Sequence, residues 1–521
     1  MDSIYKPYPI GIENFEDLIN GGFIYVDKTE FLYRMTKHKG YFLLCRPRRF
    51  GKSLFLSTIE AFFEGKRELF EGLAITKYDY DWEPTPVLHL NLVTMDASSP
   101  ESLENSLDTQ FRKWEAKYGI TEIAKNLTDR FGAIIETAYK KTGKQVVILI
   151  DEYDKPLVSY IDDEETKDKF RKILKPIYSN LKGRDKYIRM GLLTGVSRFS
   201  RLSIFSDINN LHDISFSEDY AAICGITEEE MLANFQYGIQ QLAETNNLTY
   251  DEAVASLKAN YDGYHFTENC PDIYNPFSLL SALQESRVDN YWFATGTPTF
   301  LMRAVAARGV NLQQYFTEQE TTTRLLSQTD TYSAGILPML FQTGYLTIKD
   351  YNPETKRYRL GIPNQEVEIG LFEGLLPICA HVDAENSDNF INSCSDALRY
   401  GRPEDFLEQL QSFLADIPYD LTAKKPEIYF ENNLYIIFKM LGFSVQTEYR
   451  TSRGRIDILI TTPKYIYVIE LKLDGSAEDA LRQIEEKGYA TPFTADSRQL
   501  YRIGINLSSS THTLTDWLIR S

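Results

Sequence analysis

The stretch Tyr41-Phe-Leu-Leu-Cys-Arg46-Pro-Arg-Arg-Phe-Gly51-Lys52-Ser53 decides the fold of the first part of the chain. The apolar residues 41–45 predict a buried strand, and residues 53–63 favour a helix. A Gly-Lys-Ser loop between such a strand and helix can surround a phosphate group with backbone N–H groups and the helix N-terminus. The usual eight-residue pattern begins with glycine, whereas this chain has Arg46, so the motif needs support from its context.

A second apolar run ends in two adjacent carboxylates. Residues 146–150 are followed by Asp151-Glu152, the arrangement of a Walker B strand. We predict that Asp151 and Ser53 hold Mg²⁺ and that Glu152 polarises the attacking water. Thr194 follows the next apolar run and is placed to sense the γ-phosphate, whereas Arg198 could stabilise transferred charge or lie at the surface. The predicted nucleotide-binding residues are Arg49, Phe50, Gly51, Lys52, Ser53, Leu54, Asp151 and Thr194.

The order of the apolar runs predicts an α/β sheet in the first part of the chain. Four runs, at residues 41–45, 87–92, 146–150 and 188–193, are separated by long polar segments that favour crossover helices. The pattern then becomes mainly helical, and the last 100 residues or so return to short strands and helices. We predict an ATPase-like domain at 1–217, a helical region at 218–420 and a compact α/β domain at 421–521.

Residues 336–360 of the helical region predict a helix followed by a β-hairpin. This pattern is compatible with a winged-helix element, but such units are common and a purely structural role is the more frequent one. Earlier in the same region, Thr227 with Glu230 three residues on is predicted to open a helix.

Two carboxylates and a lysine are predicted to meet in a hairpin near the C-terminus. A turn centred between Pro463 and Lys464 places Asp457 opposite Glu470, and Lys472 shares a face with Glu470 because side chains alternate with period two. Such a cluster can bind Mg²⁺ and steer a water molecule at a phosphodiester bond. A surface hairpin with solvated charges is the alternative, although the apolar neighbours favour burial, and buried carboxylates need a partner.

Two arginine clusters are candidate contacts for nucleic acid. Arg450, Arg453 and Arg455 precede Asp457 with no acidic residue among them, and Arg46, Arg48 and Arg49 lie in the phosphate loop. The whole chain has 74 acidic and 56 basic residues, a net charge of −18, which repels nucleic acid. We therefore expect any DNA contact to be local to these clusters and to weaken strongly with salt.

These motifs resemble a family of bacterial proteins in which an AAA-ATPase-like domain is joined to a nuclease-like domain of the PD-(D/E)xK superfamily. The family implies an ATPase of the additional-strand class with its own arginine-containing phosphate loop. The resemblance covers nearly the whole chain and rests on Tyr25-Val-Asp-Lys-Thr29, residues 46–53, Ile150-Asp-Glu-Tyr-Asp-Lys-Pro156, Thr194-Gly-Val-Ser-Arg198, Tyr261-Asp-Gly-Tyr-His-Phe266, Tyr274-Asn-Pro-Phe277, Gly454-Arg-Ile-Asp457, Ile469-Glu-Leu-Lys472 and Ala480-Leu-Arg-Gln483.

The resemblance also implies roles at the C-terminal site. It makes Asp457 and Glu470 metal ligands and Lys472 the residue that orients or activates the water. Gln483, with Tyr489 as a further candidate, would touch the site or the DNA backbone. The superfamily often adds a carboxylate from its first helix, for which Glu427 and Glu431, one helical turn apart, both qualify. The 261–266 and 274–277 motifs suggest aromatic packing only.

Cysteine spacing and hydropathy indicate the cellular compartment of the protein. The five cysteines form no C-x-x-C pair, no apolar run approaches 20 residues, and no signal peptide is evident. We predict a cytoplasmic protein with no membrane partner, which uses ATP and Mg²⁺ and cleaves DNA under ATP control. The alternatives are a nucleotide-switched protein that binds nucleic acid or signals without cutting, and a remodelling ATPase that assembles into rings. Self-association into a homo-oligomer is left open.

Overall fold

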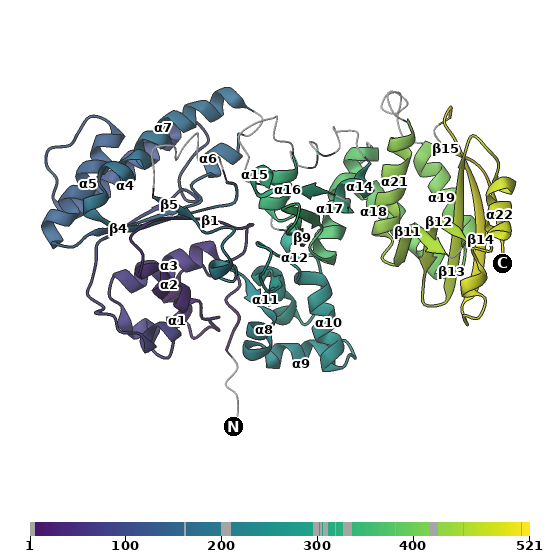
Figure 1. The fold of residues 1–521 in the computed structure, drawn as a ribbon, viewed down its shortest axis with the longest axis horizontal. Coiled ribbons are helices and arrows are strands. Elements are labelled where there is room, and N and C mark those ends of the chain that lie inside the picture. Colours follow the sequence, from purple (N-terminus) through teal and green to yellow (C-terminus); the bar gives the residue numbers. More distant parts are fainter. Residues whose placement is uncertain are drawn as a thin grey trace. The chain divides into compact units, whose positions relative to one another are not determined.

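The chain folds into two compact units, shown in Figure 1 from a computed structural model. Unit 1 comprises Met1–Trp292 and Gln319–Glu366, and unit 2 comprises Phe293–Glu318 and Val367–Ser521. The three domains expected from the sequence pattern stay a prediction. The structure describes residues 6–160, 163–198, 210–294, 302, 305, 311–317, 319–326, 336–380, 382–415, 426–451, 453–511 and 513–521.

A five-stranded parallel sheet forms the centre of unit 1, with the strand order β2-β3-β4-β1-β5. Strand β4 is therefore inserted between β1, which leads into the phosphate loop, and β3, which ends in Asp151. This insertion defines the additional-strand class, so the predicted fold class is confirmed. The strands are β1 (Gly40–Cys45), β2 (Val87–Asn91), β3 (Val146–Asp151), β4 (Ile188–Gly195) and β5 (Leu211–Asp213).

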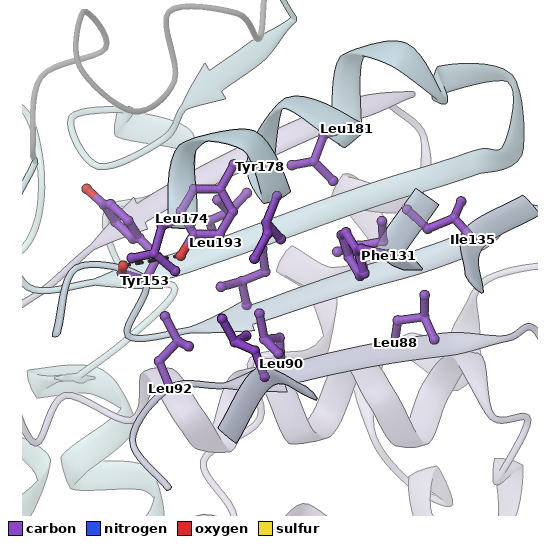
Figure 2. Packing of buried hydrophobic residues seen from close by; sticks show 14 of the residues in the cluster. Leu88, Leu90, Leu92, Phe131, Ile135, Tyr153, Leu174, Tyr178, Leu181 and Leu193 are labelled. Carbon is purple, nitrogen blue, oxygen red and sulfur yellow. Dashed lines mark hydrogen bonds between the residues drawn. The ribbon is translucent and has the colours of Figure 1, made fainter. Parts of the chain in front are cut away.

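Helices cover both faces of this sheet because its central strands are apolar on both sides. In Figure 1, α1 (Phe15–Asn20), α2 (Thr29–Thr36) and α3 (Lys52–Phe63) lie on one face. The other face carries α4 (Pro100–Tyr118), α5 (Leu127–Thr142) and α7 (Glu164–Gly183). Figure 2 shows side chains of β2, of the residue that follows it, and of α5 and α7 packed on this second face: Leu88, Leu90, Leu92, Phe131, Ile135, Leu174, Tyr178 and Leu181.

The rest of unit 1 is mainly helical. The predicted helix opening is confirmed, because Thr227 and Glu230 cap α8 reciprocally. The predicted helix and hairpin are also confirmed as α16 (Leu337–Thr343), β9 (Thr347–Asn352) and β10 (Arg357–Gly361), joined by β8 (Glu320–Thr321) in the order β8-β10-β9. The other helices here are α8 (Glu228–Asn234), α9 (Gln236–Thr245), α10 (Tyr250–Tyr261) and α11 (Pro276–Glu285).

Unit 2 contains a mixed five-stranded sheet in the order β11-β12-β13-β14-β15. Only β13 and β14 pair in parallel, and α22 (Ala477–Glu486) connects them. The predicted register is confirmed, since Ile458 pairs with Ile469 and Thr461 with Ile466. The strands are β11 (Ser444–Thr451), β12 (Gly454–Thr461), β13 (Tyr465–Leu473), β14 (Gln499–Ser508) and β15 (Thr513–Arg520).

Further helices in the described part of unit 2 are α14 (Leu312–Thr317), most of α17 (Gln365–Ala380), α18 (Ala384–Arg399), α19 (Pro403–Ala415) and α21 (Pro426–Met440). Helix α17 begins in the last residues of unit 1 and continues into unit 2. No helix in the described part of the chain is long and apolar enough to cross a membrane. The short elements are α6 (Lys155–Val158), β6 (Ile226–Thr227), β7 (Ile273–Tyr274), α12 (Tyr291–Ala294), α15 (Thr323–Leu326) and 3₁₀ turns at Arg67–Phe70, Ala74–Lys77, Asp185–Tyr187, Glu218–Tyr220 and Thr491–Phe493.

Candidate functional site

The phosphate loop passes through two left-handed residues before helix α3 begins. Arg49 has a φ of 67° and Gly51 a φ of 89°. A side-chain carbon at Gly51 would meet no atom within 4 Å, so the loop is open at this residue. Turned backbone of this kind, followed by a helix N-terminus, forms concave anion-binding sites. The loop therefore has the geometry that phosphate binding needs, despite Arg46 at its first position.

Lys52 lies inside the loop and is only 4 % exposed. Its ammonium group donates to the backbone oxygens of Arg46, at 3.1 Å, and Pro47, at 3.0 Å. Ser53 is next to it in the first turn of α3. The two residues predicted to contact phosphate and Mg²⁺ are thus brought together at the start of this helix.

Asp151 ends β3 and is fully buried. Its Oδ1 accepts a hydrogen bond from the Thr194 hydroxyl at 2.6 Å, whereas its Oδ2 has no hydrogen-bond partner in the described part of the chain. A buried carboxylate oxygen without a donor is costly unless a cation compensates it, so this residue fits a Mg²⁺ ligand. Glu152 follows with a φ of 48°, a costly left-handed conformation for a residue with a side chain.

A largely apolar cavity of about 90 Å³ adjoins the phosphate loop. The predicted loop residues Phe50, Gly51 and Leu54 form one wall. The Tyr25–Val26 segment and Pro276 belong to other walls, so two of the sequence motifs without a predicted role meet here. An apolar lining next to a phosphate site suits a flat heterocyclic base.

The second site lies where the β12–β13 ladder of unit 2 ends. Asp457 lies next to the Ile458–Ile469 pair, the pair of that ladder farthest from the turn, and its Oδ2 accepts a hydrogen bond from the Leu471 N–H at 2.8 Å. Glu470 is 1 % exposed, and Lys472 lies two residues further along the same strand. The structure thus brings together the two carboxylates and the lysine that the sequence predicted.

Gln483 of α22 connects two of these residues. Its Nε2 donates to Glu470 Oε1, and its Oε1 accepts from Lys472 Nζ at 2.6 Å. Lys472 Nζ is 3.6 Å from Glu470 Oε1. The amide group therefore holds Lys472 and Glu470 in a fixed arrangement.

Burial dominates the electrostatics of this site. It raises the pKa of Glu470 to about 7, and the nearby negative charge of Asp457 adds to the shift. The pKa of Asp457 is also raised by burial, against the effect of the Leu471 hydrogen bond. Glu470 Oε2 has no hydrogen-bond partner in the described part of the chain. Two desolvated carboxylates with an unpartnered oxygen fit a divalent cation, which would compensate both charges.

The other residues predicted near this site are a tyrosine, two glutamates and three arginines. Tyr489 is in the core of unit 2, and its hydroxyl accepts a hydrogen bond from the Arg455 N–H at 3.3 Å. The side chains of Glu427 and Glu431 are outside the described residues. Within the described residues, no group of three or more histidine, cysteine, aspartate or glutamate side chains is suited to a metal. Arg450, Arg453 and Arg455 are exposed around the β11–β12 turn.

Segments in both halves of the chain match known protein families. A family described as "Predicted AAA-ATPase" matches residues 9–205, and the "PD-(D/E)XK nuclease superfamily" matches residues 425–517. The "Uncharacterized protein in vnfD 5'region" of Azotobacter chroococcum mcd 1 is 34 % identical over 530 residues, 99 % of each chain. The chain belongs to this AAA-ATPase-like family with a PD-(D/E)XK nuclease superfamily domain. The resemblance inferred from the motifs is confirmed.

Arg46 has a structural role in this AAA-ATPase-like domain. It is 1 % exposed, and its guanidinium group donates to the backbone oxygens of Cys45, at 2.9 Å, and Ser215, at 2.8 Å, and to Tyr220 at 3.2 Å. It also lies 4.0 Å from the centre of the Phe266 ring. The expectation that Arg46 helps to form a DNA-binding cluster is wrong for this structure, because the residue is buried among carbonyl groups.

We expect Arg46→Gly, which restores the usual first residue of the loop, to destabilise unit 1. It removes the guanidinium donor from several buried carbonyl groups, and each buried group that is left unsatisfied costs about 1–3 kcal/mol. A total loss of roughly 3 kcal/mol or more follows. The free energy of unfolding in urea measures it, with the exposed Arg67→Gly as the control; equal stability of Arg46→Gly and the wild type would contradict this role.

Sequence reasoning missed Asp154, three residues beyond Asp151. Its Oδ2 accepts from the backbone N–H groups of Val196, at 3.1 Å, and Ser197, at 2.6 Å, and burial raises its pKa to about 7. Asp154 therefore fixes the segment that follows Thr194. Arg198 in the same segment donates to Asp213 Oδ2 at 2.9 Å. The repeated acid in Asp-Glu-Tyr-Asp was the available signal for Asp154.

Proposed function

We propose that this protein binds and hydrolyses ATP and that ATP regulates metal-dependent cleavage of DNA by its C-terminal domain in the cytoplasm. The observation that carries the proposal is the desolvated Asp457–Glu470 pair, with the unpartnered Glu470 Oε2 beside Lys472. A carboxylate pair with an adjacent lysine is the donor set for a divalent cation and a water molecule at a phosphodiester bond.

In the ATPase-like domain, the predicted residues would bind the phosphate groups, the base and the metal ion of ATP. Lys52 would exchange the carbonyl groups of Arg46 and Pro47 for phosphate oxygens, and the adjoining cavity would accept the base. Asp151 and Ser53 would hold Mg²⁺, which supplies positive charge beside the transferred phosphoryl group when bound.

Two residues at the edge of the sheet would act on the phosphate that is transferred. Glu152 would orient the attacking water and accept its proton. Thr194 would contact the γ-phosphate from the adjacent strand, with its hydroxyl oriented by Asp151. The arrangement supports hydrolysis because the polarising, sensing and charge-binding groups follow the carboxyl ends of neighbouring strands.

In the PD-(D/E)XK domain, Asp457 and Glu470 would hold the divalent cation, which acts as a Lewis acid at the scissile phosphate when bound. Lys472 would orient the attacking water, and Gln483 would hold the lysine and Glu470 in place. The exposed arginines of the β11–β12 turn would bind the DNA backbone.

Cleavage of supercoiled and linear plasmid DNA tests the proposal. We expect cleavage with Mg²⁺ or Mn²⁺, none with EDTA, and a rate that changes when ATP is added. ATP hydrolysis is measured on the same samples as phosphate release. Cleavage that persists in EDTA, or that is insensitive to ATP while ATP is hydrolysed, contradicts the corresponding part of the proposal.

One observation favours the alternative, a nucleotide-switched protein that binds nucleic acid without cutting it. Only two carboxylates converge at the second site among the described residues. This alternative predicts DNA binding that responds to ATP, with no cleavage by the wild type in Mg²⁺ or Mn²⁺. Gel-shift and cleavage assays on one preparation separate the two functions.

Salt dependence tests whether the β11–β12 arginines bind DNA. For a net charge of −18, we expect binding to be confined to this cluster and to weaken steeply with salt. Each lost phosphate contact lowers the slope of log K against log salt by about 1, so Arg453→Gln should reduce it by about that amount. Fluorescence anisotropy measures the slope, with the exposed Arg112→Gln in unit 1 as the control. An unchanged slope for Arg453→Gln would exclude this contact.

A further inference from the structure

The four residues Arg46–Arg49 of the phosphate loop each contact a different later segment of unit 1. Arg46 contacts Phe266, as described above, and the Arg49 guanidinium group lies 5.2 Å from the centre of the Phe277 ring. These contacts give the two aromatic motifs a place in the fold: they pack against the phosphate loop. The residues that distinguish this loop from the usual glycine-rich one are therefore its connections to the rest of unit 1.

Pro47 and Arg48 make the contacts that lead out of the loop. A side-chain carbon at Gly344 would lie 2.8 Å from Pro47 Cβ, so only glycine allows this close approach. The Arg48 backbone oxygen accepts a hydrogen bond from the Trp292 indole N–H at 3.2 Å, and the Arg48 guanidinium group is 4.9 Å from the Trp292 ring. Trp292 is fully buried.

Trp292 is the residue at which the chain first leaves unit 1, and Glu366 is the residue at which it leaves unit 1 for the second time. These two exit points are bonded to each other, because the Trp292 backbone N–H donates to Glu366 Oε1 at 2.7 Å. Ser278 of α11 donates to the same oxygen at 3.0 Å. The phosphate loop is thus connected by direct contacts to both exits from unit 1.

The segments that follow Trp292 and Glu366 also contact each other within unit 2. The Phe293 ring occupies the space where a side chain at Gly370 of α17 would be. Two residues before Gly370 in α17, Glu368 Oε1 accepts from Lys439 Nζ at 2.6 Å. Lys439 belongs to α21, the first helix of the PD-(D/E)XK domain.

From these contacts we propose that Trp292, Glu366 and helix α17 form a coupling element that transmits nucleotide binding at the phosphate loop to the PD-(D/E)XK domain. The inference rests on the proposed function and names the residues that carry its regulation. The switch is Lys52, whose ammonium group bonds to the Arg46 and Pro47 carbonyls and would leave them for phosphate oxygens. Loss of those bonds changes the loop next to Arg48, and a ligand shifts a conformational equilibrium through such differential contacts.

The coupling element can be broken at two places outside both sites. Trp292→Phe keeps an aromatic ring but removes the indole N–H that bonds to Arg48. Lys439→Glu replaces the attraction to Glu368 by repulsion, and Glu368→Lys/Lys439→Glu restores an ion pair of reversed polarity. Trp114→Phe, in the core of unit 1 and away from the loop, is the matched control for the tryptophan change.

The readout is the distance between the units, measured by double electron–electron resonance. Spin labels at the exposed positions Lys140→Cys in unit 1 and Glu486→Cys in unit 2 are placed in a chain whose Cys270 and Cys379 are serine. The distance distribution is recorded with and without a non-hydrolysable ATP analogue, and the affinity for the analogue is measured on the same samples. Cleavage rates with and without ATP are recorded for the unlabelled variants.

We expect the analogue to shift the distance distribution in the wild type and in Trp114→Phe. Trp292→Phe and Lys439→Glu should bind the analogue normally yet lose the shift, and the double charge reversal should recover it. The effect of ATP on cleavage should fall by about 5- to 150-fold, the usual size of such couplings. Retention of the full shift by both broken variants, or no recovery in the double variant, would overturn the coupling element.

Two further outcomes separate this inference from the proposed function. A wild type that hydrolyses ATP and cleaves DNA without any nucleotide-dependent shift overturns the coupling and leaves both activities standing. A wild type that binds no nucleotide overturns the ATPase proposal and the coupling together.

Discussion

Lys52→Ala should reduce ATP hydrolysis by at least about 100-fold, because it removes the charged group that lies inside the phosphate loop. Lys52→Met is the sharper variant, since it keeps most of the buried volume while removing the ammonium group. Either change leaves the carbonyl groups of Arg46 and Pro47 without their donor, at a cost of about 1–2 kcal/mol of stability. Phosphate release measures the effect, and circular dichroism shows that the variants fold.

The exposed Lys77→Ala is the control for a general effect of losing a lysine from unit 1. Near-normal hydrolysis by folded Lys52→Met would rule out the proposed nucleotide site. The same variant tests regulation, because DNA cleavage should lose its response to ATP. If Lys52→Ala leaves cleavage unchanged with and without ATP, nucleotide does not gate the PD-(D/E)XK domain.

Asp457→Asn should abolish metal-dependent DNA cleavage while preserving the fold. Its amide oxygen can still accept the Leu471 N–H, but the group no longer carries the charge that a divalent cation requires. Mutation of groups that only surround metal ligands reduces metal affinity or activity by about 10- to 100-fold. Loss of a ligand itself should therefore reduce the cleavage rate by at least about 100-fold. Plasmid nicking over a range of Mg²⁺ and Mn²⁺ concentrations measures the effect.

Asp479→Asn, in the first turn of α22, is the matched control in the same domain. DNA binding by Asp457→Asn should persist, because the β11–β12 arginines are unaffected. Undiminished cleavage by Asp457→Asn would show that the reaction takes place elsewhere in the chain. Absence of cleavage by both the wild type and Asp457→Asn, with binding intact in both, would support the non-cutting alternative.

Local pattern was sufficient to predict both sites in outline. The turn at Pro463 and Lys464 defines the hairpin register, and a register defines which side chains face each other, so Asp457 and Glu470 could be paired in advance. The strands that carry Asp151 and Thr194 at their ends could also be predicted, because a strand buried on both faces is a nearly continuous apolar run up to its last one or two residues.

Contacts between distant segments were not predictable from these patterns. Ser215 is separated from Arg46 by 169 residues, and nothing in the local sequence indicates that a loop arginine will be buried among carbonyl groups. The burial of Tyr489 was not predictable either, because a tyrosine beside charged residues can be solvated or buried, and only the packing of unit 2 decides between the two.

The two positions at which the chain leaves unit 1 determine the order in which the two units can fold during synthesis. Gly344, Trp292 and Glu366 complete the surroundings of the phosphate loop, yet the ribosome adds them long after Lys52. The PD-(D/E)XK domain follows residue 366, and the remaining residues take on the order of ten seconds to synthesise. The ATPase-like unit therefore has all its residues before the nuclease-like domain is complete, so a newly made chain can fold the first while the second is still being synthesised.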